Sequence, residues 1–191
     1  MYYVLDRFGA MNPCRWIERF PHIPGVSWDL GRRHQTLIRE PLEFELKPMN
    51  PDASDHGPEM PEFLKGHVPL FRDDLVAALR EAGVDNLDLY TTVIVDPDSG
   101  QRHTNYKAVN IIGSISAADM ARSNSTVNPG GPVLDVAFDG FAVNERKAGG
   151  ALMFRLAENT GAILLHESVV DHLLERGFEK LEFLDPGEVA L

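Results

Sequence analysis

The chain has 191 residues, 43% of them hydrophobic and 25% charged, which predicts a folded domain with a substantial core. The single cysteine, Cys14, excludes an internal disulfide and a cysteine-based zinc cluster, and no apolar run approaches the ~20 residues of a membrane-spanning helix. The formal net charge of −11 argues against nucleic-acid binding, because phosphate contacts need Lys and Arg.

The N-terminus predicts an intracellular protein. Met1–Arg7 has no basic region followed by an apolar run and a small-residue cleavage site, so we expect no signal peptide. Together with the lone cysteine, this favours the reducing cytoplasm and no membrane partner.

Residues 1–69 combine short strand patterns with irregular sequence. Tyr2–Leu5, residues 26–30 and Leu42–Leu46 have the composition or alternation of strands. Over residues 47–69, closely spaced prolines exclude both helix and central strand. We therefore expect a variable N-terminal part with a Pro-rich acidic arm, followed by a regular core over residues 70–184.

The core begins with one helix and one hairpin. An apolar stripe over Pro69–Ala82 predicts an amphipathic helix that stops at Gly83. Leu87–Val95 and Tyr106–Gly113 read as paired strands around the turn residues 96–100. A capping-box spacing at Ser116 predicts a short helix through Arg122.

The C-terminal third repeats part of this order. Strand patterns at 133–136, 141–143, 152–157 and 162–165 precede a predicted helix over Ser168–Arg176 and a strand over Leu181–Leu184. Leu75–Tyr90 aligns without gaps to Val169–Leu184, each giving a helix, a Gly stop and a strand. We attribute this echo to shared helix–turn–strand physics rather than duplication, and expect both helices on one face of one sheet.

The resulting fold prediction is one α+β domain spanning residues 1–191. It has a mostly antiparallel sheet with two main helices packed on it, plus an irregular N-terminal arm. Five apolar positions should be buried in its core: Leu79, Val109, Ile111, Phe154 and Leu173.

No motif identifies a catalytic or metal site. None of the seven histidines belongs to an HExxH motif or an i, i+4 pair, and no GxSxG, GxxxxGK[ST] or GxGxxG motif is present. Cys14 fits a core position, and Asn110 fits a hydrogen-bonded core amide. We therefore predict no catalytic residue, no metal, no cofactor and no enzymatic activity.

Five stretches in the same order resemble a bacterial protein family: Leu79–Tyr90, Tyr106–Gly113, Leu152–Glu158, Ile163–Glu167 and Arg176–Phe178. They are similar to immunity family eleven, a former domain of unknown function common in myxobacteria and later classed with the immunity proteins of polymorphic toxin systems. The resemblance covers residues 70–184 and is carried mostly by core and turn residues. It implies a protein of interbacterial competition that neutralises a cognate toxin by stoichiometric occlusion.

The charge distribution indicates where such a partner would bind. Residues 40–100 carry fourteen acids against four bases, whereas residues 1–39 carry six Arg against three acids. A basic toxin is therefore predicted to dock on an acidic patch. Its candidate residues are Asp52, Asp55, Glu59, Glu62, Asp73 and Asp74, with Trp16 and Trp28 as secondary candidates.

Two other functions stay open. One is a small hydrolase or nucleotide-modifying enzyme with a spatially assembled His/Asp site. The other is a regulator that binds a protein other than a toxin. The acidic charge also has a simpler explanation, which is solubility.

Overall fold

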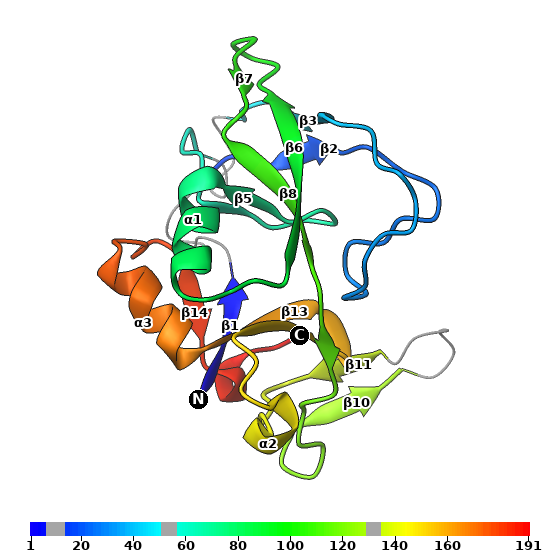
Figure 1. Ribbon diagram of the computed structural model, residues 1–191, viewed down its shortest axis with the longest axis vertical. Coiled ribbons are helices and arrows are strands. Elements are labelled where there is room, and N and C mark those ends of the chain that lie inside the picture. The colour runs from blue at the N-terminus through cyan, green and yellow to red at the C-terminus, as the bar shows by residue number, and fades with distance from the viewer. Residues whose placement is uncertain (7–13, 51–56, 129–134) are drawn as a thin grey trace.

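The computed structural model describes residues 1–6, 14–50, 57–128 and 135–191 (Figure 1). Its helices are α1 (Asp73–Glu81), α2 (Glu145–Ala148), α3 (Glu167–Glu175) and the short 3-10 helix η1 (Pro186–Glu188). The strands are β1 (Tyr2–Asp6), β2 (Ile17–Arg19), β3 (Leu42–Leu46), β4 (Phe63–Leu64), β5 (Leu70–Arg72), β6 (Leu87–Val95), β7 (Arg102–His103), β8 (Tyr106–Ile111), β9 (Ser114–Ile115), β10 (Ser125–Val127), β11 (Val136–Phe138), β12 (Met153–Leu156), β13 (Asn159–His166) and β14 (Glu182–Leu184). The predicted α+β class is confirmed. In this described part of the chain, no helix is long and apolar enough to cross a membrane.

The strands are divided between two main sheets and the two-stranded ribbon β10–β11. The seven-stranded sheet has the order β2-β3-β6-β8-β5-β4, with β7 beside β6, and its only parallel pair among the described strands is β3–β6. The five-stranded sheet has the order β14-β1-β13-β12-β9 and is antiparallel except for β12–β9. The predicted hairpin is confirmed as β6–β8, and β1 is an interior strand, so the N-terminal part contributes to both sheets.

The sequence echo corresponds to one motif that occurs in each sheet. In the seven-stranded sheet, α1 connects β5 to β6, and β8 lies between these two strands. In the five-stranded sheet, α3 connects β13 to β14, and β1 lies between them. The expectation that both helices cover one face of one sheet is therefore wrong. Instead α1 and α3 pack against each other beside the two sheets (Figure 1).

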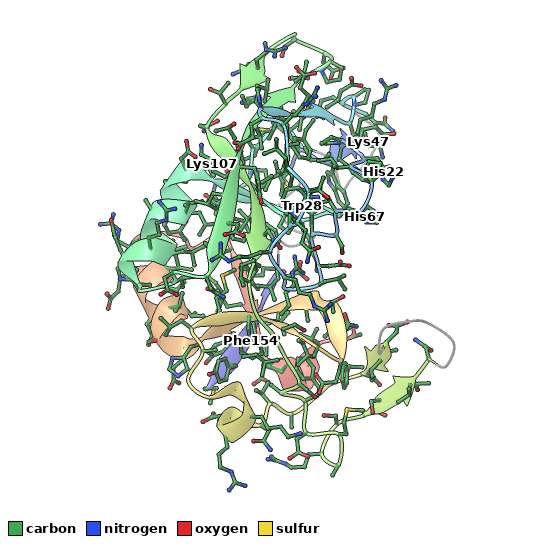
Figure 2. The ribbon with its side chains drawn as sticks, turned by 45° about the vertical axis from the view of Figure 1, so that its right-hand side comes forward. His22, Trp28, Lys47, His67, Lys107 and Phe154 are labelled. Atoms are coloured by element: carbon green, nitrogen blue, oxygen red, sulfur yellow. The ribbon has the colours of Figure 1, made fainter. Side chains whose placement is uncertain are left out.

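Three apolar clusters hold the layers together. The central cluster joins α1 and α3 to strands of both sheets, and it contains the buried residues Leu79, Val109, Ile111 and Leu173. A second cluster, with Phe154, lies between the five-stranded sheet and the segments around β11 and α2 (Figure 2). A third lies on the seven-stranded sheet. The five predicted core residues are all fully buried.

Three of the predicted elements named above differ from the structure as follows. Residues 116–122 are not helical, because Ser116 donates its hydroxyl to Glu158 and Asp119 pairs its backbone N–H with Ala142 instead of starting a helix. Helix α1 begins at Asp73 rather than at residue 69, because Leu70–Arg72 pairs with β8. Residues 26–30 contain no strand, and residues 28–30 form bends.

Candidate functional site

The predicted acidic patch is only partly described, and its described members are paired. Asp52 and Asp55 lie outside the described residues. Glu59 forms an ion pair with Lys180, and the Asp73 carboxylate lies 2.7 Å from the Lys107 ammonium (Figure 2). These pairs neutralise much of the local negative charge, which weakens the patch as a source of attraction for a cation.

Arg72 gathers the other two acids at the start of α1. Its guanidinium lies 3.2 Å from Glu62 and 2.7 Å from Asp74. The hydrogen bond from Arg72 holds the pKa of Asp74 below its usual value, although partial burial acts in the opposite direction. The structure thus brings Glu62, Asp73 and Asp74 together, but it pairs them with the cations of Arg72 and Lys107. Whether they bind a partner stays a prediction.

The two tryptophans have different positions. Trp28 is only 7% exposed and packs edge-on against His34 and Tyr90, at centroid distances of 4.8 and 5.4 Å. It therefore belongs to the third apolar cluster and anchors its segment rather than offering a contact surface. Trp16 is partly buried beside β2, where its carbonyl accepts a hydrogen bond from the Lys47 backbone.

The segment around Trp28, residues 20–41, is the main irregular feature that the structure describes, and we call it the arm loop. It has no helix or strand (Figure 1). Its buried Trp28 and Ile38 belong to the third cluster on the seven-stranded sheet. Loops of this length without secondary structure are uncommon in compact domains and usually functional.

Polar contacts fix the arm loop to the strands beneath it. The fully buried Asn110 amide donates to the Arg32 carbonyl at 2.8 Å, as expected for a core amide. Glu40 accepts from the backbone and hydroxyl of Thr91, and Gly113 donates to the Gly31 carbonyl. Since these contacts fix its middle and its C-terminal end, this part of the loop is held against the strands.

The surface of the arm loop has exposed apolar side chains and three neighbouring hollows. Leu37 is 89% exposed and Phe20 is 42% exposed. One hollow of about 190 Å³ lies between Phe20, His22, Trp28 and His67 (Figure 2). Another of about 270 Å³ follows Arg32–Thr36. Asp29 and His67 connect the first of these to a larger cavity of about 350 Å³ at the seam between the two sheets.

Arg155 lines this seam cavity and is a functional candidate that sequence reasoning missed. It lies in β12, is 3% exposed, and donates from Nη1 to the Thr160 carbonyl at 2.6 Å. Its buried Nε has no hydrogen-bond partner, and burial lowers the pKa of Arg155 to about 10, against the opposing effect of Asp29. The available signal was a cation inside an otherwise apolar strand, Leu152–Ala157.

The histidines do not converge on one centre in the part of the chain that the structure describes. His22 and His67 line one hollow, His34 packs on Trp28, His166 caps α3, and His172 lies 3.6 Å from Glu81. His56 lies outside the described residues. No group of three or more His, Cys, Asp or Glu side chains suited to a metal ion occurs among the residues described.

Comparison of the chain with protein-family models and with curated proteins found no match.

Proposed function

We propose that this chain is an immunity protein that binds a cognate toxin with one-to-one stoichiometry and blocks it by occlusion. The class of partner comes from the family resemblance carried by residues 70–184. The observation that supports a binding role is the arm loop, which is long, irregular and yet fixed in place by buried side chains.

An ordered loop of this kind favours affinity. Because Trp28 and Ile38 are already buried, little backbone freedom remains to be lost when a partner binds. Leu37 and Phe20 then supply exposed apolar area, next to hollows that receive side chains of a partner. These features favour the arm loop, rather than the paired acids near α1, as the contact surface of the proposed complex.

Charge has a separate role in the proposal. The net charge of −11 attracts a basic toxin over a longer range and speeds the encounter. Short-range contacts at the arm loop then determine how slowly the complex dissociates.

The proposal is tested by co-purification with the product of the neighbouring reading frame, followed by a Leu37→Asp variant. A charge placed in the contact should weaken toxin binding at least about ten-fold and reduce protection of cells, since it would be desolvated in the complex. Leu37 is almost fully exposed, so folding should be unchanged.

A matched control is Leu174→Asp, because Leu174 is also an exposed leucine but lies on α3. Its variant should bind the toxin like the wild type. Equal affinity for the Leu37→Asp variant and the wild type would exclude the arm loop as the contact surface. A neighbouring gene product that neither binds nor kills would instead favour a regulator of another protein.

A further inference from the structure

The seam cavity contains a buried cation that forms no ion pair with the described residues, and Asp29 in the same lining offsets its charge only at longer range. Arg155 makes one hydrogen bond, from Nη1 to the Thr160 carbonyl, and no ion pair with any residue that the structure describes. Its Nε is unpartnered. A buried guanidinium of this kind is costly, because the charge has lost its water without gaining a carboxylate or phosphate.

The buried Arg15 shows what a compensated guanidinium looks like in the same molecule. It is 6% exposed, and its Nη2 lies 2.9 Å from Asp96, with Asp98 at 3.5 Å from Nη1. Arg155 has a similar degree of burial and lacks such a partner among the described residues. The Nε of Arg15 is also unpartnered, so the two arginines differ in the missing carboxylate and in the much larger cavity that Arg155 lines.

The cavity has the size and walls of a small-molecule site. Its volume of about 350 Å³ lies within the range of ligand pockets. Leu5, Phe63 and Ile163 provide apolar walls from both sheets. A ligand for this cavity therefore has an apolar body together with a group that guanidinium recognises.

The charges around the cavity select the number of charges on the ligand. Lys65 lines the cavity but is already paired with Asp6 at 3.0 Å. Asp29 lines it as a negative group. Arg155, which forms no ion pair with the described residues, is left to pair with a ligand. Asp29 already offsets part of its charge and would repel a ligand that carries a second negative charge.

We propose that the seam cavity is a binding site for a small organic monocarboxylate, whose carboxylate accepts hydrogen bonds from Arg155 and whose apolar part lies against Phe63, Leu5 and Ile163. Guanidinium and carboxylate match in geometry and charge, and the pairing is strongest where water is excluded. The site does not depend on toxin binding, so the two proposals stand or fall separately.

The test is calorimetric titration of the full chain with hexanoate at constant ionic strength. Two probes accompany it: 1-hexanol, which has the same apolar body without charge, and inorganic phosphate, which has the charge without the body. We expect saturable binding of hexanoate at one site, with 1-hexanol and phosphate each at least about ten-fold weaker. Comparable binding of either probe, or hexanoate binding that does not saturate, would overturn the assignment.

Two variants locate the site. Arg155→Met keeps the apolar stem and should lose at least about ten-fold in hexanoate affinity while unfolding at the same or a higher temperature, because it removes an uncompensated buried charge. Asp29→Asn, at the exposed rim, should bind hexanoate several-fold more tightly because a repelling charge is gone.

Arg15→Met is the matched control, since it removes a buried but paired arginine. It should lower the unfolding temperature and leave hexanoate affinity unchanged. If the Arg155→Met variant does not fold, the hexanoate affinity of the Asp29→Asn variant still tests the proposed site. Unchanged hexanoate affinity in the Asp29→Asn variant, or full affinity in a folded Arg155→Met variant, would refute the site.

Discussion

At the scale of single residues, the central cluster depends on a few fully buried side chains. Leu79 projects from α1 into the cluster that joins the two sheets. Leu79→Ala should lower the free energy of unfolding by about 2–5 kcal/mol, since it loses transfer free energy and leaves a cavity. Chemical denaturation measures this value. Leu174→Ala, at an exposed leucine on α3, should change it by less than about 0.5 kcal/mol. A comparably small effect at Leu79 would mean that α1 does not face the cluster.

We expect the docking of the arm loop to depend on pH through His34. Burial lowers the pKa of His34 below its usual 6.5, against the opposing effect of Asp88, and its buried Nε2 has no hydrogen-bond partner. The unfolded chain therefore binds a proton before the folded chain does as the pH falls. The free energy of unfolding is therefore higher at neutral pH, where His34 is uncharged in both states. It falls as the pH drops below about 6.5 toward the lower pKa that His34 has in the folded chain.

Denaturation at pH 7.5 and 5.5 tests this assignment. The wild type should lose more free energy of unfolding between these two pH values than His34→Gln does, because the variant has no titrating group at this position. The other histidines are common to both proteins and cancel in the comparison. Equal losses would show that His34 titrates alike in the folded and unfolded states.

At the scale of elements, residue spacing predicts the structures that are formed by residues close together in the sequence. The hairpin, the two main helices and their glycine stops follow from residue spacing, since Gly83 and Gly177 both have the positive φ that ends a helix. Strand partners do not follow from spacing. Nothing in Tyr2–Asp6 shows that it pairs with β13 and β14, and so the two sheets could not be predicted.

The same limit applies to the candidate site. Counting charges identified an acidic region, but counting does not show that Arg72 and Lys107 pair with Glu62, Asp73 and Asp74. The seam cavity could not be predicted either, because it is lined from β1, from β4 and from the neighbouring strands β12 and β13, three regions that lie far apart in sequence.

At Gly31 the arm loop approaches the body closely. Its φ is +67°, and a Cβ there would lie 2.8 Å from the Gly113 carbonyl carbon and 2.9 Å from Ser114. Gly31→Ala should therefore cost more than the ~1–2 kcal/mol of a left-handed backbone alone. Gly100→Ala isolates that backbone cost, because Gly100 has a φ of +73° and nothing within 4 Å of the added methyl.

Two measurements distinguish loop detachment from global destabilisation. Chemical denaturation should show a larger loss of free energy for Gly31→Ala than for Gly100→Ala. Tryptophan fluorescence under native conditions should change for Gly31→Ala, because Trp28 belongs to the loop and is buried against the sheet only while the loop is docked. Similar losses of unfolding free energy in the two variants would mean that the backbone near Gly113 moves aside at little energetic cost.

At the scale of the whole molecule, the two sheets share one core through α1 and α3. Because Leu79 and Leu173 lie in the same cluster, unfolding of one sheet exposes the apolar face of the other. We therefore expect one cooperative transition. Trp28 reports by fluorescence on the seven-stranded sheet, whereas far-UV circular dichroism reports on both sheets. The two urea transitions should coincide, and separated midpoints would show that each sheet unfolds independently.

The charge of the whole molecule leads to the last prediction, which rests on the proposed toxin partner. Glu59→Lys/Asp73→Lys reverses two acids of the predicted patch, and Glu175→Lys/Glu179→Lys makes the same change in charge at exposed acids on and after α3. If net charge steers the encounter and the arm loop makes the contact, both variants should slow association equally. The effect should shrink as salt shortens the range of the field to about 8 Å near 0.15 M. A clearly larger loss for Glu59→Lys/Asp73→Lys, with folding intact, would place the toxin on the acidic patch instead.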